Sequence, residues 1–309
     1  MPDENVLALA DVELATIESS AGERLSTVEV DRIRAAFSRA LPVDVRDDRF
    51  SDSWADETDQ FIGTVAMLEG NEIGYVGGRI SSDVIQLDAF VASDTGVDDA
   101  DLLGLLLGKT LDRLKAHPDR PQRVELWAKP ALDGHADAAE AAGFDSLRAL
   151  HQMRCALPAQ QSTIATRSFL FDADADAFLR VNNRAFEGHP DQGNMSRSDL
   201  DDATSEPWFN ADGIRLYEED GQIAGFCWTK IHAEQQLGEI YAIGIDPDFH
   251  GKGLGVPMTA AGLDWLSEQG LTTGMLYVEA DNDPALRTYD RLGFTIFRTD
   301  RAWLLPNSL

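Results

Sequence analysis

The second half of the chain repeats the first half. When the sequence is slid against itself by about 150 residues, Val124–Met153 lies over Gly274–Trp303, and AAGF in the first half meets RLGF in the second. Upstream, Asn71–Ile80 lies over Gly221–Ile231 with a slip of one residue. This self-similarity predicts a tandem repeat of one α/β unit, with its strands and helices in the same order in both copies.

The length of the chain agrees with two hydrophobic cores. A chain of 309 residues is long for one compact domain and comfortable for two of ordinary size. The polar stretch ALPAQQST, around Pro158, separates the two copies. We therefore expect two domains of the α/β class, residues 1–157 and residues 158–309.

The second half contains the clearer element signals. Alternating apolar residues with β-branched or aromatic side chains predict four strands: Ile214–Asp220, Ile223–His232, Glu239–Ile245 and Met275–Ala280. Helical spacing of apolar residues predicts a helix over Val256–Gln269 that stops at Gly270. A second helix is expected over Pro284–Leu292, with Asp283 as its N-cap and Gly293 as its end.

The charge of the chain excludes some classes of partner. A formal net charge of −28 disfavours nucleic acid and anionic membrane surfaces, because both require a cationic face.

The densest apolar run, Leu102–Leu111, is too short to span a bilayer, and the acidic start does not resemble a signal peptide. Two cysteines outside any ligand pattern predict neither a disulfide framework nor a metal site. We expect a cytoplasmic protein without a metal.

The glycine-rich stretch HGKGLG, His250–Gly255, joins a predicted strand to a predicted helix. A dinucleotide fingerprint needs a glycine at its sixth position, but counting from Gly251 gives Val256 and counting from Gly253 gives Met258. A nucleotide-triphosphate P-loop needs Ser or Thr after Gly-Lys, where this chain has Gly253. The remaining pattern suits a pyrophosphate held by backbone N–H groups and a helix start, or a simple connecting turn.

The flanks of this stretch resemble the acetyl-CoA core of the GNAT N-acetyltransferases. The resemblance runs from Gly238 to Phe294 and ends in Asn-x-x-Ala-x-x-x-Tyr-x-x-x-Gly-Phe, beginning at Asn282. His250 stands where that family usually has Gln or Arg, a position used largely through its backbone. The resemblance implies acetyl-CoA as cosubstrate, held by Ile243, Gly244, Ile245, His250, Gly251, Lys252, Gly253, Leu254, Gly255, Val256, Asn282, Asp283, Pro284, Ala285, Leu286 and Arg287.

Further motifs resemble one family within the GNATs, the mycothiol synthases or mycothiol acetyltransferases of actinobacteria, which are also tandem GNATs. These motifs are AFEGHPDQG (Ala185–Gly193), EPWF (Glu206–Phe209), GFCWTK (Gly225–Lys230), the run Leu237–Gly255 and LYVEADN (Leu276–Asn282). The similarity extends more loosely into the first half through WAKP and LHQMR. It implies transfer of acetyl from acetyl-CoA to the cysteinyl amine of a cysteinyl-glucosaminyl-inositol precursor.

The resemblance assigns roles to two residues. Glu239 matches the general base, which takes a proton from the amine directly or through a water. Tyr289 matches the general acid, which protonates the departing CoA thiolate, and the backbone N–H near Ile245 would bind the oxyanion. Without the resemblance, Glu239 would be interpreted as an exposed carboxylate at the start of a strand. Tyr289 would be interpreted as a tyrosine of the hydrophobic core.

The resemblance also implies four substrate contacts in the second half and one in the first. By matched position these are Asp191, Lys230, Glu239 and Tyr277, and Asp191 replaces a frequent Glu. In the first half, RFSDSW resembles a substrate-binding segment of the family's first domain and places Asp52 there. Sugar and inositol hydroxyls are suitable partners for such groups.

The first half departs from the catalytic pattern. Where the second half has HGKGLG, the first half has TGVDDADLLG, Thr95–Gly104, with three aspartates and no basic residue. Such a loop would repel a pyrophosphate. Ala139 falls opposite Tyr289, so the general acid is missing as well. We expect a non-catalytic GNAT-like domain, and a monomer in which the two copies supply the pairing that single GNAT units find by dimerising.

Two other functions fit parts of the sequence. One is a GNAT that acetylates a different small-molecule amine, which would have no reason to carry GHPDQG, WTK and YVEADN together. The other is an acyl-CoA-binding regulator without catalysis, for which the degenerate first half gives some support. Retention of both Glu239 and Tyr289 weighs against a regulator.

Overall fold

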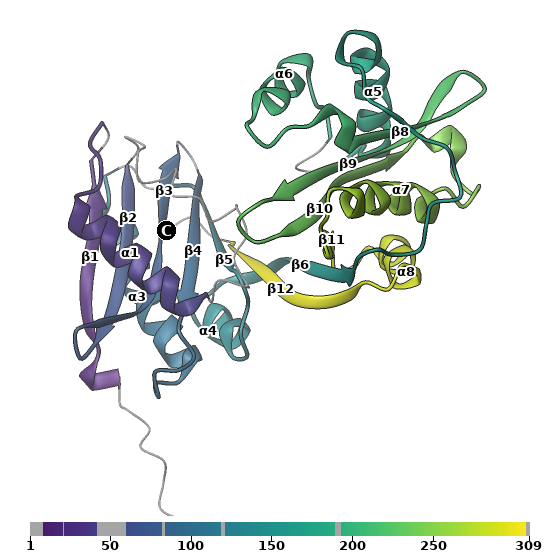
Figure 1. The fold of residues 1–309 in the computed structure, drawn as a ribbon. Helices are drawn as coiled ribbons and strands as arrows, with labels where there is room; N and C mark the ends of the chain where they lie inside the picture. The colour runs from purple at the N-terminus through teal and green to yellow at the C-terminus, as the bar shows by residue number, and fades with distance from the viewer. Residues whose placement is uncertain are drawn as a thin grey trace, which may run out of the picture. The chain divides into compact units, whose positions relative to one another are not determined.

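The computed structural model describes residues 9–20, 22–41, 60–81, 84–118, 121–188 and 193–306. The chain divides into two compact units (Figure 1). Unit 1 comprises Met1–Leu150 and Arg298–Leu309, and unit 2 comprises His151–Phe297. Within the described ranges, no helix combines the length and the apolar character needed to cross a membrane.

Unit 1 is built on a sheet with the strand order β1-β2-β3-β4-β5-β12. Its elements are η1 (Leu9–Asp11), β1 (Glu13–Ser19), α1 (Thr27–Ala40), β2 (Phe61–Leu68), β3 (Asn71–Ser81), β4 (Val84–Val91), α3 (Asp99–Ala116), β5 (Arg123–Ala128) and α4 (His135–Ala141). Strands β1 to β4 pair antiparallel and β4 pairs parallel with β5. Helix α1 packs on one face of this sheet and α3 on the other.

Unit 2 is built on a sheet with the strand order β6-β11-β10-β9-β8-β7. Its elements are β7 (Arg167–Ser168), α5 (Phe171–Ala185), α6 (Arg197–Ser205), η3 (Ala211–Gly213), β8 (Ile214–Glu219), β9 (Gln222–His232), β10 (Leu237–Ile245), η4 (Pro247–Phe249), α7 (Gly255–Glu268), β11 (Thr273–Glu279) and α8 (Asp283–Arg291). The four predicted strands and two predicted helices are confirmed, each within a few residues of its expected bounds.

The repeat in the sequence corresponds to a repeated order of strands and helices in the structure. Strands β2 to β5 with α3 and α4 follow the same order as β8 to β11 with α7 and α8. Two long strands then pass from one unit to the other: β6 (Asp145–Ala156) enters unit 2 at His151, and β12 (Thr295–Leu305) enters unit 1 at Arg298. In unit 1, the end of β12 pairs antiparallel with β5 over Arg301–Leu305.

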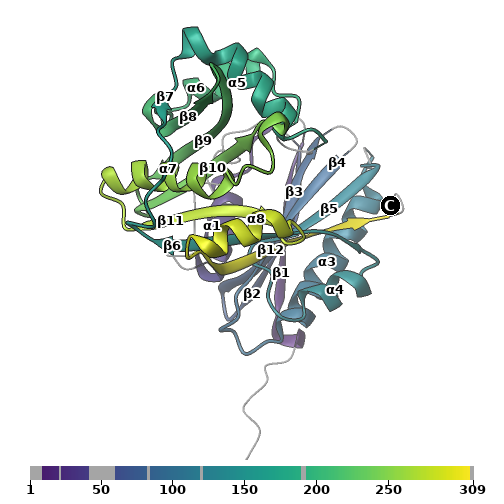
Figure 2. The same cartoon turned by 90° about the vertical axis from the view of Figure 1, so that its right-hand side faces the viewer.

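The two faces of the unit 2 sheet carry different helices (Figure 2). Helices α7 and α8 pack with residues such as Cys227, Ile240 and Leu276 on one face. Helices α5 and α6 pack with Phe226 and Trp228 on the other face. Because neighbouring residues of a strand alternate between faces, each strand residue can be assigned to the α7 face or the α5 face.

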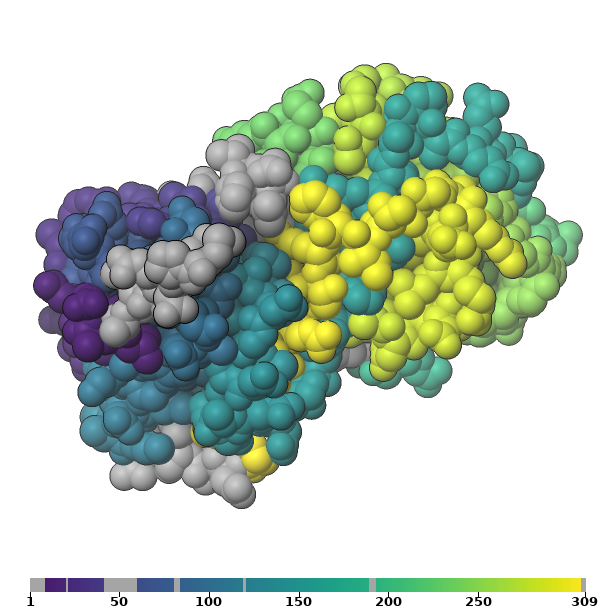
Figure 3. Space-filling model, turned by 90° about the horizontal axis from the view of Figure 1, so that it is seen from below, coloured from purple at the N-terminus to yellow at the C-terminus, as the bar shows by residue number. Residues whose placement is uncertain are grey.

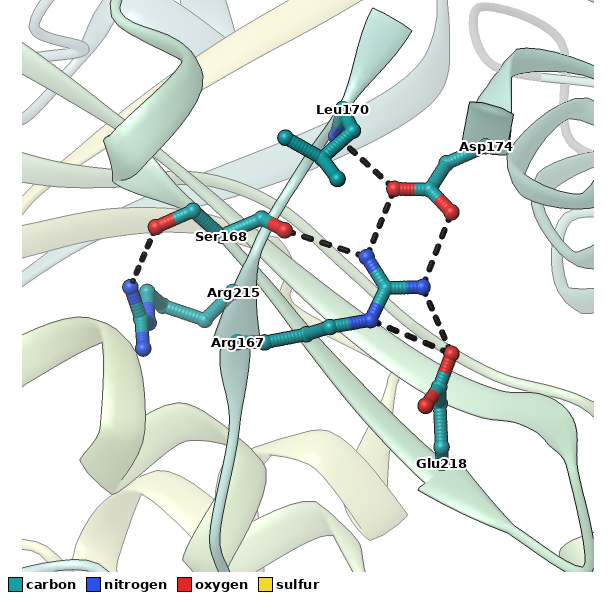
Figure 4. Close-up of polar contacts among 6 residues, drawn as sticks. All are labelled: Arg167, Ser168, Leu170, Asp174, Arg215 and Glu218. Carbon is teal, nitrogen blue, oxygen red and sulfur yellow. Dashed lines mark hydrogen bonds and ion pairs between the residues drawn. The ribbon is translucent and has the colours of Figure 1, made fainter. Parts of the chain in front are cut away.

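An ion-pair network joins β7, α5 and β8 (Figure 4). Arg167 binds both carboxylate oxygens of Asp174, at 2.6 and 2.8 Å, and also Oε1 of Glu218. Asp174 accepts a further hydrogen bond from the backbone N–H of Leu170, at 2.8 Å, at the start of α5. The hydrogen bonds from Arg167 lower the pKa of Asp174 below its ordinary value. The network therefore fixes the entry of the chain into α5.

Candidate active site

Strand β10 separates from one of its two neighbours part-way along its length. It pairs with β9 from Leu237 to Ile245, but its parallel pairing with β11 extends only from Gly238 to Ile240. The register with β9 shifts at this point, and Tyr241 is the extra residue of a β-bulge. Strand β11 therefore supplies no ladder partner for residues 243–245, the strand end that the sequence assigns to acetyl-CoA.

The glycine loop follows directly after this strand end. Gly251 and Gly253 have φ angles of +78° and +73°, a region that glycine adopts without steric cost. Helix α7 begins at Gly255, and its N-cap residue Leu254 makes no side-chain hydrogen bond to the helix. The N–H groups of the first turn of a helix need such a partner or an external acceptor. The loop and the helix start thus fit an anion.

Two side chains of the loop contact the strands beside it. Nζ of Lys252 lies 2.5 Å from Oε1 of Glu219 and 4.7 Å from the ring centroid of Phe249. The hydrogen bond to Glu219 raises the pKa of Lys252, so this ammonium group stays charged at neutral pH. His250 is hydrogen bonded through Nε2 to the carbonyl oxygen of Ile245, at 3.0 Å. The imidazole thereby ties the loop to the end of β10.

Glu239 is buried and lies beside a histidine. It stands opposite Lys230 in the pairing of β10 with β9, so the two side chains point to the same face, the α5 face. Oε2 of Glu239 lies 2.7 Å from Nε2 of His232, and the residue is only 8% exposed. The alternative of an exposed carboxylate at a strand start is therefore wrong.

Lys230 lies against a cluster of aromatic rings. Its Nζ is 4.4 Å from the ring centroid of Trp208 and 5.7 Å from that of Tyr241. These two rings lie 5.2 Å apart, and Trp228 packs against both of them. Tyr241 is 39% exposed at the bulge. Trp208 and Tyr241 thus hold the ammonium group by cation–π attraction on the Glu239 face, and Trp228 supports both rings.

Tyr289 lies on the other face of the sheet. It is buried in the core of α7 and α8, with its ring centroid 5.8 Å from that of Phe294. Burial raises the pKa of Tyr289 well above its ordinary value, and neighbouring Cys227 adds to the rise. A phenol in this state remains protonated at neutral pH.

Helix α8 begins one residue earlier than the sequence indicates. The N-cap is Asn282, whose side-chain oxygen accepts a hydrogen bond from the N–H of Ala285, at 3.2 Å. The assignment of Asp283 as N-cap was wrong: Asp283 is the first helical residue, because the Asn282 side chain already caps the N–H of the third helical residue, Ala285. The side chains of Asp283 and Arg287, four residues apart on α8, are both exposed. Figure 3 shows the C-terminal segment of the chain, drawn in yellow, on the surface of the face in view.

The arrangement of elements occurs in known acetyltransferases. The acetyltransferase (GNAT) family profile matches residues 177–294. A GCN5-related N-acetyltransferase structure from Sphaerobacter thermophilus superposes with a TM-score of 0.67 at 16% identity, over 94% of this chain and 95% of that one. A tandem GNAT protein from the clavulanic acid biosynthesis pathway superposes with a TM-score of 0.55 at 15% identity, over 94% and 98%. These similarities show the GNAT fold in a tandem arrangement.

The sequence relatives identify a narrower family than the structural matches do. A mycothiol acetyltransferase of Streptomyces coelicolor is 43% identical over 186 residues, which is 58% of this chain and 60% of that protein. A mycothiol acetyltransferase of Acidimicrobium ferrooxidans is 38% identical over 255 residues, which is 78% of this chain and 82% of that protein. This chain belongs to the mycothiol acetyltransferase family. The match to the Streptomyces coelicolor member nevertheless spans only 60% of its length.

In this member of the mycothiol acetyltransferase family, unit 1 differs from unit 2 at the corresponding places. The counterpart of α7 is α3, whose N-cap Asp98 accepts hydrogen bonds from the N–H groups of Ala100 and Asp101. Its own carboxylate thus occupies the helix start. Strand β4 pairs with β5 without interruption over Val84–Ala89, and Ala139 is buried at the place that corresponds to Tyr289.

Most of the predicted site residues lie in the described ranges. Lys230 and Glu239 are brought together on the α5 face, and Tyr277 of β11 shares that face by its register. Ile243, Ile245, Val256, Ala285 and Leu286 pack partly buried against the core of α7 and α8. Asp52 and Asp191 lie outside the described residues.

The site also contains residues that sequence reasoning missed. His232 follows Lys230 by two residues in one strand, and this spacing places both side chains on one face of β9. The pairing of Lys230 with Glu239 makes this the Glu239 face. Trp208 and Tyr241 lie near Lys230 as well, and Tyr241 stands at the bulge of β10. A single sequence gives no signal for a bulge.

Proposed function

We propose that this chain transfers acetyl from acetyl-CoA to the cysteinyl amine of cysteinyl-glucosaminyl-inositol and so forms mycothiol. The names of its relatives support this activity. The observation that carries this proposal is that β10 separates from β11 part-way along its length. A buried carboxylate lies on one face of the sheet and a buried phenol on the other. A thioester that enters this opening would have a base on its amine side and an acid on its sulfur side.

Glu239 acts as the general base in this proposal. An α-amine has a pKa of roughly 7.7–8.0 and must lose a proton before or during its attack on the thioester. His232 fixes one carboxylate oxygen of Glu239 at 2.7 Å, which leaves the other oxygen for the amine or for an intervening water. Burial of Glu239 on the α5 face also keeps the reaction away from bulk water.

Tyr289 acts as the general acid, and the end of β10 binds the oxyanion. The raised pKa of Tyr289 keeps its proton in place until the sulfur develops negative charge. A backbone N–H near Ile245, released from the ladder with β11, would donate to the oxygen of the tetrahedral intermediate. The new amide bond forms as the carbon–sulfur bond breaks, and CoA leaves as the thiol.

Acetyl-CoA binds once, in the second half of the chain, in this proposal. Residues 250–256 would offer backbone N–H groups and the Lys252 ammonium group to the pyrophosphate, and residues 282–287 would also hold the cofactor. The uncapped start of α7 fits this role, whereas the start of α3 is capped by Asp98. We therefore assign residues 158–309 to catalysis and residues 1–157 to a non-catalytic domain.

Lys230, Tyr277, Asp191 and Asp52 bind the sugar and inositol part of the amine. Lys230 is placed for this role beside Glu239. We further propose a monomer, because the tandem repeat already provides a pair of GNAT units in one chain. The proposed place of work is the cytoplasm.

An activity assay tests the proposed function. Purified protein is mixed with acetyl-CoA and, in separate reactions, with the cysteinyl-glucosaminyl-inositol amine, an aminoglycoside and simple primary amines. The proposal requires CoA release with the first amine and far slower release with the others. Turnover of another amine, with none of the cysteinyl conjugate, would falsify the assignment of the substrate.

A further inference from the structure

A chain of three polar side chains lies on the Glu239 face of unit 2. Gln152 of β6 is fully buried. Its Nε2 donates a hydrogen bond to the hydroxyl oxygen of Tyr277, and its Oε1 accepts one from Nε of Arg154, at 3.0 Å. Met153 and Cys155, which alternate with these residues, pack in the core on the opposite face.

The chemistry of Arg154 determines the direction of both hydrogen bonds. A guanidinium group can only donate, whereas a glutamine amide has one accepting oxygen and one donating nitrogen. The Gln152 oxygen must therefore face Arg154, and its nitrogen must face Tyr277. The Tyr277 oxygen then accepts from Gln152, so the hydrogen of this hydroxyl group points away from Gln152.

Arg154 is itself held in position. Its guanidinium carbon lies 3.5 Å from the ring centroid of Phe297, a cation–π contact. The ring belongs to β12 in the part of that strand assigned to unit 2. The donor that orients Gln152 is thus packed against a neighbouring strand.

Tyr277 shares a face with the proposed base. In the parallel register of β10 and β11, Glu239 pairs with Met275, and Tyr277 follows Met275 by two residues. Ile240 and Leu276, which alternate with them, pack on the α7 face. Since paired residues share a face and alternate residues of a strand return to it, Tyr277 and Glu239 point to the same side.

We infer that Gln152 and Arg154 are positioning residues that make Tyr277 a hydrogen-bond donor toward the substrate. This inference rests on the proposed function, in which Tyr277 contacts the amine substrate. The acceptor would be a hydroxyl or ring oxygen of the sugar or inositol part of that substrate. It also gives a physical role to the LHQMR motif, which the catalytic assignments leave unused.

The substitution Gln152→Glu tests the inference with little change in side-chain volume. A carboxylate accepts from Arg154 and also from Tyr277, so it turns the Tyr277 hydrogen inward. We expect the KM for the cysteinyl-glucosaminyl-inositol amine to rise about 3- to 10-fold, with kcat and the KM for acetyl-CoA unchanged. Tyr277→Phe should give the same rise, and the double variant should give no further rise. Met153→Leu, on the opposite face of the same strand, is the matched control and should leave both KM values unchanged.

Two results would overturn the inference. One is an unchanged amine KM in Gln152→Glu; the other is an additive effect with Tyr277→Phe, which would mean that Gln152 acts independently of Tyr277. If Gln152→Glu does not fold, Gln152→Met removes both hydrogen bonds and undergoes the same cycle, in which non-additivity with Tyr277→Phe again decides. A wild-type protein that binds acetyl-CoA but never acetylates this amine contradicts the proposed function, and the role of Tyr277 toward that amine fails with it.

Discussion

Nε2 of His232 lies 2.7 Å from Oε2 of Glu239, and both residues are buried on neighbouring strands. The contact orients a carboxylate that the proposed reaction uses as a base. Because His232 holds one oxygen of this carboxylate, the position of the other oxygen is fixed as well. A neighbouring partner commonly orients a catalytic group in this way.

Glu239→Gln should lower kcat/KM for the amine by about 10²- to 10⁴-fold at pH 7, because an amide cannot accept the proton of the amine. The affinity for acetyl-CoA should stay the same. The loss should shrink as the pH rises above about 8, since more of the amine is then already deprotonated. A steady-state pH profile measures this, and a defect of constant size from pH 7 to about 9 would argue against general-base catalysis by Glu239.

Tyr289→Phe should lower kcat with little effect on the Kd of acetyl-CoA, because the ring still fills the core and only the proton donor is lost. The expected loss is about 10²-fold or more. The raised pKa of Tyr289 also predicts that the wild-type rate shows no alkaline decline from this group up to about pH 10. If the substitution instead abolishes acetyl-CoA binding, the role as general acid is wrong.

Calorimetric titration should find one acetyl-CoA bound per chain. Of the two corresponding helices, α7 begins without a side-chain cap, whereas α3 is capped. Lys252→Ala should weaken this binding about 3- to 10-fold, more at low salt than at high salt. Lys129→Ala in unit 1 is the control, since Lys129 is likewise paired with a carboxylate, that of Asp88 at 2.8 Å. Binding of two equivalents would contradict the assignment of unit 1.

Asp174→Asn should destabilise the protein by about 1–3 kcal/mol at pH 7, because it breaks the charged hydrogen bonds with Arg167 (Figure 4). The pKa of Asp174 is lower in the folded state than in the unfolded chain. The pair therefore stabilises fully above the unfolded pKa of about 3.9, and this stabilisation is lost as the pH falls through the folded value. Urea unfolding at several pH values should show the gap to wild type closing below about pH 4. A gap that stays constant would mean that the loss comes from packing.

The sequence predicted the repeat, the α/β class and the elements around the glycine loop, because these depend on local patterns. Alternation in Glu239–Ile245 and the spacing of Val256–Gln269 are properties of the segments themselves. The role of Tyr289 came from the resemblance alone, and the structure places its side chain in the core of α7 and α8.

Other features depend on pairing between distant strands. The bulge at Tyr241 and the end of the ladder at Ile240 arise from the registers of β9 and β11, which one segment alone does not determine. The contacts of Glu239 with His232 and of Gln152 with Tyr277 depend on those registers in turn. The N-cap of α8 was misplaced by one residue because Asn282 and Asp283 are both good capping residues.

The most direct test of the central claim is a competition experiment. Limiting acetyl-CoA is given to the wild-type protein in an equimolar mixture of the cysteinyl-glucosaminyl-inositol amine and other primary amines, and the acetylated products are identified by mass. The proposed function predicts that nearly all of the acetyl groups appear on the cysteinyl nitrogen, with CoA released in equal amount. Acetyl groups found mainly on another amine, or CoA released without an acetylated amine, would contradict it.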